Sequence, residues 1–111
     1  MFKLFNADGS STNISDAGSP SQVFQTTTET NVHVWVTAGT LGTLVMQCSD
    51  DNSTFVTFYP SGVAAAMTGH TTGGFTRLYD LPGGVFWRFT VSGTTDAVIR
   101  VSGIGVSLIP V

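Results

Sequence analysis

The residues best able to do chemistry lie close together near the middle of the chain. Cys48 is the only cysteine, and two adjacent carboxylates, Asp50 and Asp51, follow it closely. Adjacent acids can share a cation or divide their pKa values for acid–base work. A Ca²⁺ loop, however, needs oxygen ligands at alternating positions and a distal bidentate acid, whereas the chain turns apolar soon after Asp51. Because Asp and Asn side chains hydrogen-bond their own backbone in turns, the stretch predicts a hairpin bend.

Neither the cysteine nor the histidines are set in a catalytic frame. Cys48 alternates with Leu44 and Met46, which predicts a small buried hydrophobe, and no cation adjacent in sequence would stabilise a thiolate. The two histidines, His33 and His70, lack a nucleophile elbow or an HExxH helix. His33 is expected to be a half-exposed sheet residue, and His70 to lie in a loop. The sequence therefore predicts no enzymatic activity, no metal and no cofactor.

Composition excludes two classes of partner. Charged residues make up only 10% of the chain, against about 25% in an ordinary soluble domain, so most of the surface must be polar but uncharged. The net charge is −3 and the cations are only Lys3, Arg77, Arg88 and Arg100, too few to neutralise several phosphates. No apolar run approaches the roughly 18 residues of a membrane helix. We expect no nucleic-acid or membrane partner and, since residues 1–6 do not resemble a signal peptide, synthesis in a cytoplasm.

The periodicity of apolar residues indicates strands throughout. Good helix formers are scarce, since Glu29 is the only glutamate and Lys3 the only lysine. Valines at 32, 34 and 36 alternate with polar or aromatic residues, which places them on one face of a strand. Further strands are predicted at 43–49, 55–59, 74–79 and 85–91.

Turn residues separate these strands. Leu81-Pro-Gly-Gly84 is predicted to be a turn because Pro presets φ and Gly accepts positive φ. The last apolar run, 97–108, changes phase at Gly103, which a β-bulge within one strand would explain. Turns recur about every 8 to 12 residues, the spacing of a sandwich. The predicted fold is all-β, a single antiparallel β-sandwich or jelly-roll-like domain over residues 22–111.

Residues 1–21 have a different character. Met1 to Phe5 is too apolar for a free tail and is expected to pair as an edge strand or to dock on a neighbouring subunit. Residues 6–21 are rich in turn formers and poor in large apolar groups, which predicts a flexible arm or a long surface loop.

Three aromatic residues are candidates for an exposed surface. Trp35, Phe86 and Tyr59 are each predicted to lie opposite the core, where they could form a platform on which sugars stack. The alternative is that a second sheet or another subunit covers them, as is usual for aromatic residues of a sandwich.

The order of these signals resembles that of small β-sandwich proteins encoded in the structural gene modules of tailed bacteriophages. The resemblance rests on Val32–Val36, on Cys48–Phe55 and on Leu81–Val91, and it covers roughly residues 30–108. The chain departs from the usual motif in having Asn52 where Gly is common and Phe55 where Trp is frequent. Asn tolerates positive φ better than most residues, so the turn is expected to survive the change.

The resemblance implies a virion structural protein, foremost a capsid cement or decoration protein that binds and reinforces the lattice of the major capsid protein. It implies a homo-oligomer, a trimer or a dimer, on the exterior of the capsid of a virion whose proteins are made in the host cytoplasm. A minor tail protein, or a carbohydrate-binding module of a tail or receptor-binding protein, is the alternative. The expected partner-contact residues are Phe2, Leu4, Phe5, Val63 and Met67.

Overall fold

The protein is built from β-strands, and the part of the chain that the structure describes contains no helix. The computed structural model describes residues 2–4, 14, 20–40, 42–59, 66–68 and 74–109, with the backbone alone at 40, 66–68, 74–80 and 95. The strands in these ranges are β1 (Phe2–Leu4), β2 (Phe24–Thr26), β3 (Thr30–Thr40), β4 (Thr43–Ser49), β5 (Val56–Thr57), β6 (Ala66–Thr68), β7 (Gly74–Leu81), β8 (Val85–Ser92), β9 (Thr95–Ser102) and β10 (Val106–Leu108).

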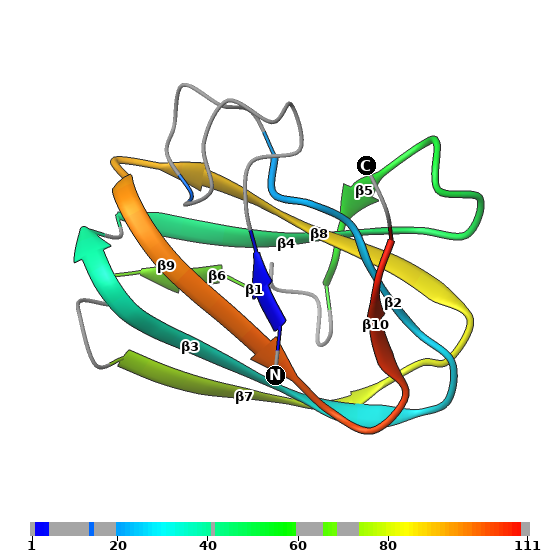
Figure 1. The fold of residues 1–111 in the computed structure, drawn as a ribbon. Coiled ribbons are helices and arrows are strands. Elements are labelled where there is room, and N and C mark those ends of the chain that lie inside the picture. The colour runs from blue at the N-terminus through cyan, green and yellow to red at the C-terminus, as the bar shows by residue number, and fades with distance from the viewer. Residues whose placement is uncertain are drawn as a thin grey trace.

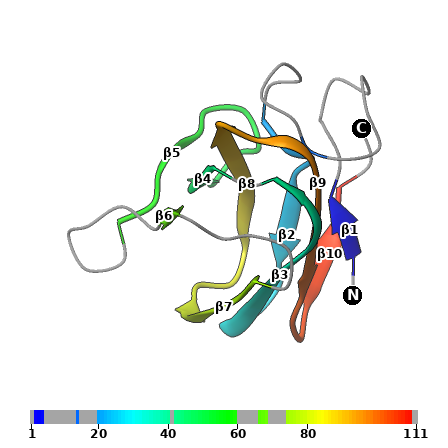
Figure 2. The same cartoon turned by 90° about the vertical axis from the view of Figure 1, so that its left-hand side faces the viewer.

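The strands form two antiparallel sheets that pack together. The four-stranded sheet has the order β1-β9-β3-β7, and the six-stranded sheet has the order β10-β2-β8-β4-β5 with β6 also paired to β4 (Figure 1). Figure 2 shows β5 and β6 at the side of the molecule opposite β1 and β10. The predicted all-β sandwich, a single compact domain, is confirmed.

The core lies between the sheets and includes the valines that alternation placed on one face of a strand. Val32, Val34 and Val36 of β3 face inward with at most 2% exposure, while His33 and Trp35 are half-buried on the other face. Trp87 and Phe89 of β8 come from the six-stranded sheet and are fully buried. Each such side chain contributes roughly 1.5–3 kcal/mol when it is removed from water. The hydrophobic contact between the inner faces therefore holds the sandwich together.

The prediction of one bulged strand over residues 97–108 is wrong. β9 ends at Ser102 in the four-stranded sheet, a turn at Gly103–Gly105 follows, and β10 pairs with β2 in the six-stranded sheet. Ile99 and Val101 point inward from one sheet, and Val106 points inward from the other. The change of phase therefore marks the passage of the chain between sheets. Ile104 lies at the tip of this turn with 82% of its surface exposed.

The described residues of the N-terminal segment, 2–4, 14, 20 and 21, join the sandwich at three places, while the rest of the arm or loop predicted over 6–21 lies outside the described residues. β1 pairs with β9 at the edge of the four-stranded sheet, which confirms the edge-strand alternative. Ile14 exchanges backbone hydrogen bonds with Ala97, at 2.8 and 2.9 Å. The Ser21 amide donates to the Phe89 carbonyl at 2.9 Å, and the Phe89 amide donates to the Ser21 hydroxyl at 2.9 Å. Leu4 is 0% exposed, so its prediction as a partner contact is wrong. Its apolar side chain faces the protein's own core because β1 continues the sheet.

A buried polar network joins the two sheets at the turn between β7 and β8. The indole Nε1 of Trp87 donates to the Thr26 hydroxyl at 3.0 Å, and that hydroxyl donates to the Pro82 carbonyl at 2.7 Å. The Gly84 amide in turn donates to the Thr26 carbonyl at 2.7 Å, where Gly84 has φ +73°. A Cβ at Gly83 would lie 2.7 Å from the Thr28 Cα, so this close approach requires glycine. Thr26 therefore fixes the predicted Pro-Gly turn.

This network predicts the effect of removing one hydroxyl. Thr26→Val keeps the shape but leaves the buried Trp87 N–H without an acceptor, and should lower the free energy of unfolding by about 1–3 kcal/mol in urea titrations. Thr27→Val is the matched control, because the Thr27 hydroxyl bonds at an exposed position and its loss should change stability by no more than about 0.5 kcal/mol. Equal effects of the two substitutions would contradict the role given to Thr26.

Candidate functional site

The two adjacent carboxylates, Asp50 and Asp51, lie in a bend between β4 and β5. One carboxylate oxygen, Oδ1 of Asp51, accepts hydrogen bonds from the Ser49 hydroxyl at 2.8 Å, the Ser53 amide at 2.9 Å and the Thr54 amide at 3.0 Å. Asn52 has φ +58°, the left-handed conformation that Asn tolerates. The prediction of a turn in which an Asp side chain bonds its own backbone is confirmed.

The same hydrogen bonds favour the charged form of Asp51. The bonds from the Thr54 amide, the Ser49 hydroxyl and the Ser53 amide lower the pKa of Asp51 below its ordinary value. All three donors bond the same oxygen, Oδ1. The described residues contain no group of three or more His, Cys, Asp or Glu side chains able to hold a metal ion. Asp51 is therefore a structural group of the bend.

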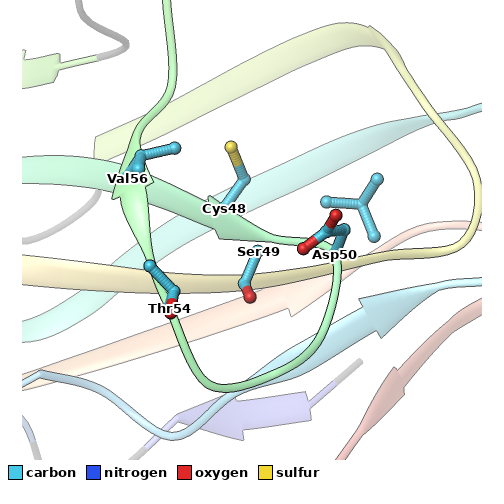
Figure 3. A pocket seen from close by; sticks show the side chains of 6 residues that line it. Cys48, Ser49, Asp50, Thr54 and Val56 are labelled. Carbon is cyan, nitrogen blue, oxygen red and sulfur yellow. The ribbon is translucent and has the colours of Figure 1, made fainter.

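An open pocket of 390 Å³ lies beside this bend (Figure 3). Its lining residues come from β4, β5, the bend between them and the start of β8, and they are Cys48, Ser49, Asp50, Thr54, Val56 and Val85. Cys48 lies opposite Val56 of β5 on one side and opposite Trp87 of β8 on the other. The pocket therefore lies on the inner face of the six-stranded sheet, near the edge that β5 forms.

The thiol in this pocket is not arranged for nucleophilic catalysis. Cys48 is half-buried against the core, less buried than the sequence predicted, because it lies near the sheet edge. This burial raises its pKa, which favours the neutral thiol over the reactive thiolate. The described residues that line the pocket include no histidine and no cation. The site can take an apolar group, but its described lining offers no positively charged group to stabilise a Cys48 thiolate.

The three aromatic candidates do not share a face. Trp35 lies on the outer face of β3 in the four-stranded sheet, whereas Phe86 lies on the outer face of β8 in the six-stranded sheet. The outer faces of a sandwich point in opposite directions, so Trp35 and Phe86 cannot form one platform. Tyr59 follows β5 and is 60% exposed. A single sugar-stacking surface made by the three residues is therefore not formed.

The other predicted partner-contact residues and the two histidines lie in several parts of the chain. Phe2 packs against the core and is half-buried. Met67 lies in β6, where the structure describes only the backbone, while Phe5, Val63 and His70 fall outside the described residues. His33 is half-buried on the outer face of β3, as predicted.

One arrangement was not predicted from the sequence. On the outer face of the six-stranded sheet, the Arg88 guanidinium lies over the Phe55 ring, with its central carbon 4.1 Å from the ring centroid. Nε of Arg88 donates to Oε1 of Gln47 at 2.8 Å, and these two residues are opposite one another in the β4–β8 register. Alternation along β8 places Arg88 outward, but only this register identifies its neighbours.

Comparisons of the chain with protein-family models, with curated proteins and with solved structures found no match. The described residues include no helix long and apolar enough to cross a membrane.

The lowered pKa of Asp51 predicts an acid-sensitive bend. A carboxyl group whose pKa is lower in the folded chain contributes stability above its unfolded pKa, and that contribution is lost as pH falls through the folded pKa. Stability measured in urea from neutral to acidic pH should thus fall less steeply for Asp51→Asn than for the unmodified protein. A carboxyl NMR titration should give Asp51 a midpoint below the ordinary aspartate value. A midpoint at or above that value would contradict the assignment.

The raised pKa of Cys48 predicts slow alkylation. Iodoacetamide should react more slowly with the folded protein at neutral pH than with the protein unfolded in urea, and the midpoint of the pH–rate profile should be higher in the folded state. Cys48→Ser should abolish labelling, since the chain has no other cysteine. A folded-state midpoint below the unfolded one would instead indicate an activated thiol.

Proposed function

We propose that this protein is a bacteriophage virion structural protein, a capsid cement or decoration protein that binds and reinforces the lattice of the major capsid protein. Its sequence motifs carry the resemblance to small phage β-sandwich proteins. Two local features support that likeness. The bend at Asp51 and Asn52 keeps a positive φ where Gly is usual, and the Pro82-Gly83-Gly84 turn leads directly into β8.

The observation that carries the proposal is an uncovered apolar edge at β5. Val56 is 58% exposed although it lies opposite the inward-facing Cys48, and Tyr59 is 60% exposed just beyond it. β5 is only two residues long and is the last strand in the order of its sheet. A short edge strand with exposed apolar side chains and an adjoining pocket suits contact with another protein better than it suits catalysis.

The scarcity of charge fits an assembly role. Apolar contacts lose little strength when ionic strength rises, whereas contacts between exposed ions are screened. A chain with 10% charged residues and an apolar edge would hold to a lattice mainly through shape and buried apolar area. In the proposed assembly the partners are the major capsid protein and further copies of this chain as a trimer or dimer, on the exterior of the capsid.

A carbohydrate-binding role in a tail or receptor-binding protein is the other candidate. It is less well supported, because Trp35 and Phe86 belong to different sheets.

The proposal predicts a fixed stoichiometry in purified particles. Quantitative mass spectrometry should find the protein in a whole-number ratio to the major capsid protein, because a cement protein occupies each equivalent lattice site. A copy number of only a few per particle would exclude cement and favour a tail component.

Two matched substitutions test the β5 edge itself. Val56→Ser should reduce the occupancy of particles to which the purified protein is added, because it removes an exposed apolar contact. Ile104→Ser is the control: Ile104 is exposed too, but it lies in the β9–β10 turn, away from β5. Equal loss of occupancy for the two variants would contradict an interface at β5.

A further inference from the structure

A single cation is held in place on the outer face of the six-stranded sheet. Gln47 accepts the hydrogen bond of Arg88 Nε, and the ring of Phe55 lies beneath the guanidinium at 4.1 Å. Two contacts in different directions define both the plane and the rotation of the guanidinium. Arginine side chains are otherwise among the most mobile, so the entropic cost of fixing this one has already been met in the folded protein.

The guanidinium is oriented but lacks an anionic partner among the described residues. Its two described contacts, with Gln47 and Phe55, are both to uncharged groups, and the hydrogen bond is donated by Nε and not by the terminal nitrogens Nη1 and Nη2. Burial lowers the pKa of Arg88. A neighbouring carboxylate would raise that pKa instead. Arg88 nevertheless stays protonated, as arginine does throughout the accessible pH range.

The free edge of this guanidinium has the geometry of a carboxylate receptor. Because Nε is engaged by Gln47, an incoming anion meets the edge formed by Nη1 and Nη2, whose parallel N–H bonds match the two oxygens of a carboxylate. A phosphate or polyanion would bring more charge than one cation can balance, and the net charge of −3 would repel it. Charge complementarity therefore favours a singly charged carboxylate.

The surroundings of Arg88 favour a carboxylate carried by an amino-acid side chain. Phe86 lies two residues before Arg88 on the same face of β8, half-buried between Gln25 of β2 and Ser49 of β4. Phe86 therefore offers apolar surface next to the cation, and Gln25 offers an amide, a mixture suited to the methylene groups and backbone of an acidic residue.

We propose that Arg88, held by Gln47 and Phe55, binds the carboxylate of an Asp or Glu side chain presented on the surface of a partner protein. This inference rests on the proposed function in taking the partner to be a protein. It adds the chemistry of one contact and assigns that contact to the outer sheet face, separate from the apolar β5 edge.

Arginine-detected NMR on the full-length protein can test the site directly. The probes are acetyl-Gly-Glu-Gly-amide and, as the matched control, acetyl-Gly-Gln-Gly-amide, at equal ionic strength. The Arg88 Nε resonance should shift on addition of the Glu peptide and saturate, with little response to the Gln peptide. Arg100 is the internal control, because it lies on β9 in the other sheet. Inorganic phosphate should shift Arg88 less than the Glu peptide does.

Three variants complete the design, with folding checked by circular dichroism. Arg88→Lys keeps the charge but loses the planar pair of donors, and should weaken binding of the Glu peptide roughly tenfold or more, read from the remaining amide resonances of β8. Gln47→Glu should neutralise the charge of Arg88 from the Nε side and strongly weaken the response to the Glu peptide while leaving the arginine in place. Arg100→Gln should bind as the unmodified protein does.

The proposal is overturned if Arg88 responds no more than Arg100, if phosphate shifts it more than the Glu peptide, or if Gln47→Glu binds undiminished. None of these measurements involves a phage particle. Arg88 could therefore fail to bind the Glu peptide although the protein is found in capsids at lattice stoichiometry. It could equally bind the peptide although the protein is absent from capsids. The two proposals are thus tested separately.

Discussion

The burial of Trp87 between the sheets, with its indole N–H bonded to the Thr26 hydroxyl, is the constraint on which the arrangement of β2, β8 and the turn before β8 depends. Trp87 is the largest fully buried side chain, and its N–H would be costly to bury without an acceptor. Thr26 supplies that acceptor and donates its own hydroxyl hydrogen bond to the Pro82 carbonyl, in the turn that leads from β7 in one sheet to β8 in the other. One buried polar contact therefore sets the position of β2 against β8 and fixes the path of the chain from β7 into β8.

The position of β8 also decides which side chains lie on each face of the six-stranded sheet. Opposite Trp87 in β4 lies Cys48, on the inner, apolar side with the pocket. One residue along, Gln47 lies opposite Arg88 on the outer side, where the guanidinium is held over Phe55. A slip of one residue in this register would exchange the two sets, burying the cation and exposing the indole. The strong preference of Trp87 for the core thus also positions Arg88.

The six-stranded sheet therefore offers two different surfaces for contact with another molecule. The apolar β5 edge and the oriented guanidinium lie on the same sheet, and they offer two kinds of contact, one insensitive to salt and one selective for a carboxylate. Such a combination would let buried apolar area supply affinity while a single charged contact sets orientation.

Local patterns in the sequence were enough to predict the fold class, the alternating core of β3, the Pro82-Gly83-Gly84 turn and the Asp51 bend. In each case the signal is short-range, since alternation and turn chemistry depend on residues a few positions apart. What only the tertiary structure decided is which sheet each strand joins and what lies opposite each residue. The phase change at Gly103 predicts a bulge or a crossing equally well, Leu4 reads as apolar whether it meets its own core or a partner, and Trp35 and Phe86 both read as outward-facing. Those choices depend on contacts between residues far apart in the chain, whereas periodicity assigns a residue to a face of its strand without identifying the neighbouring strand.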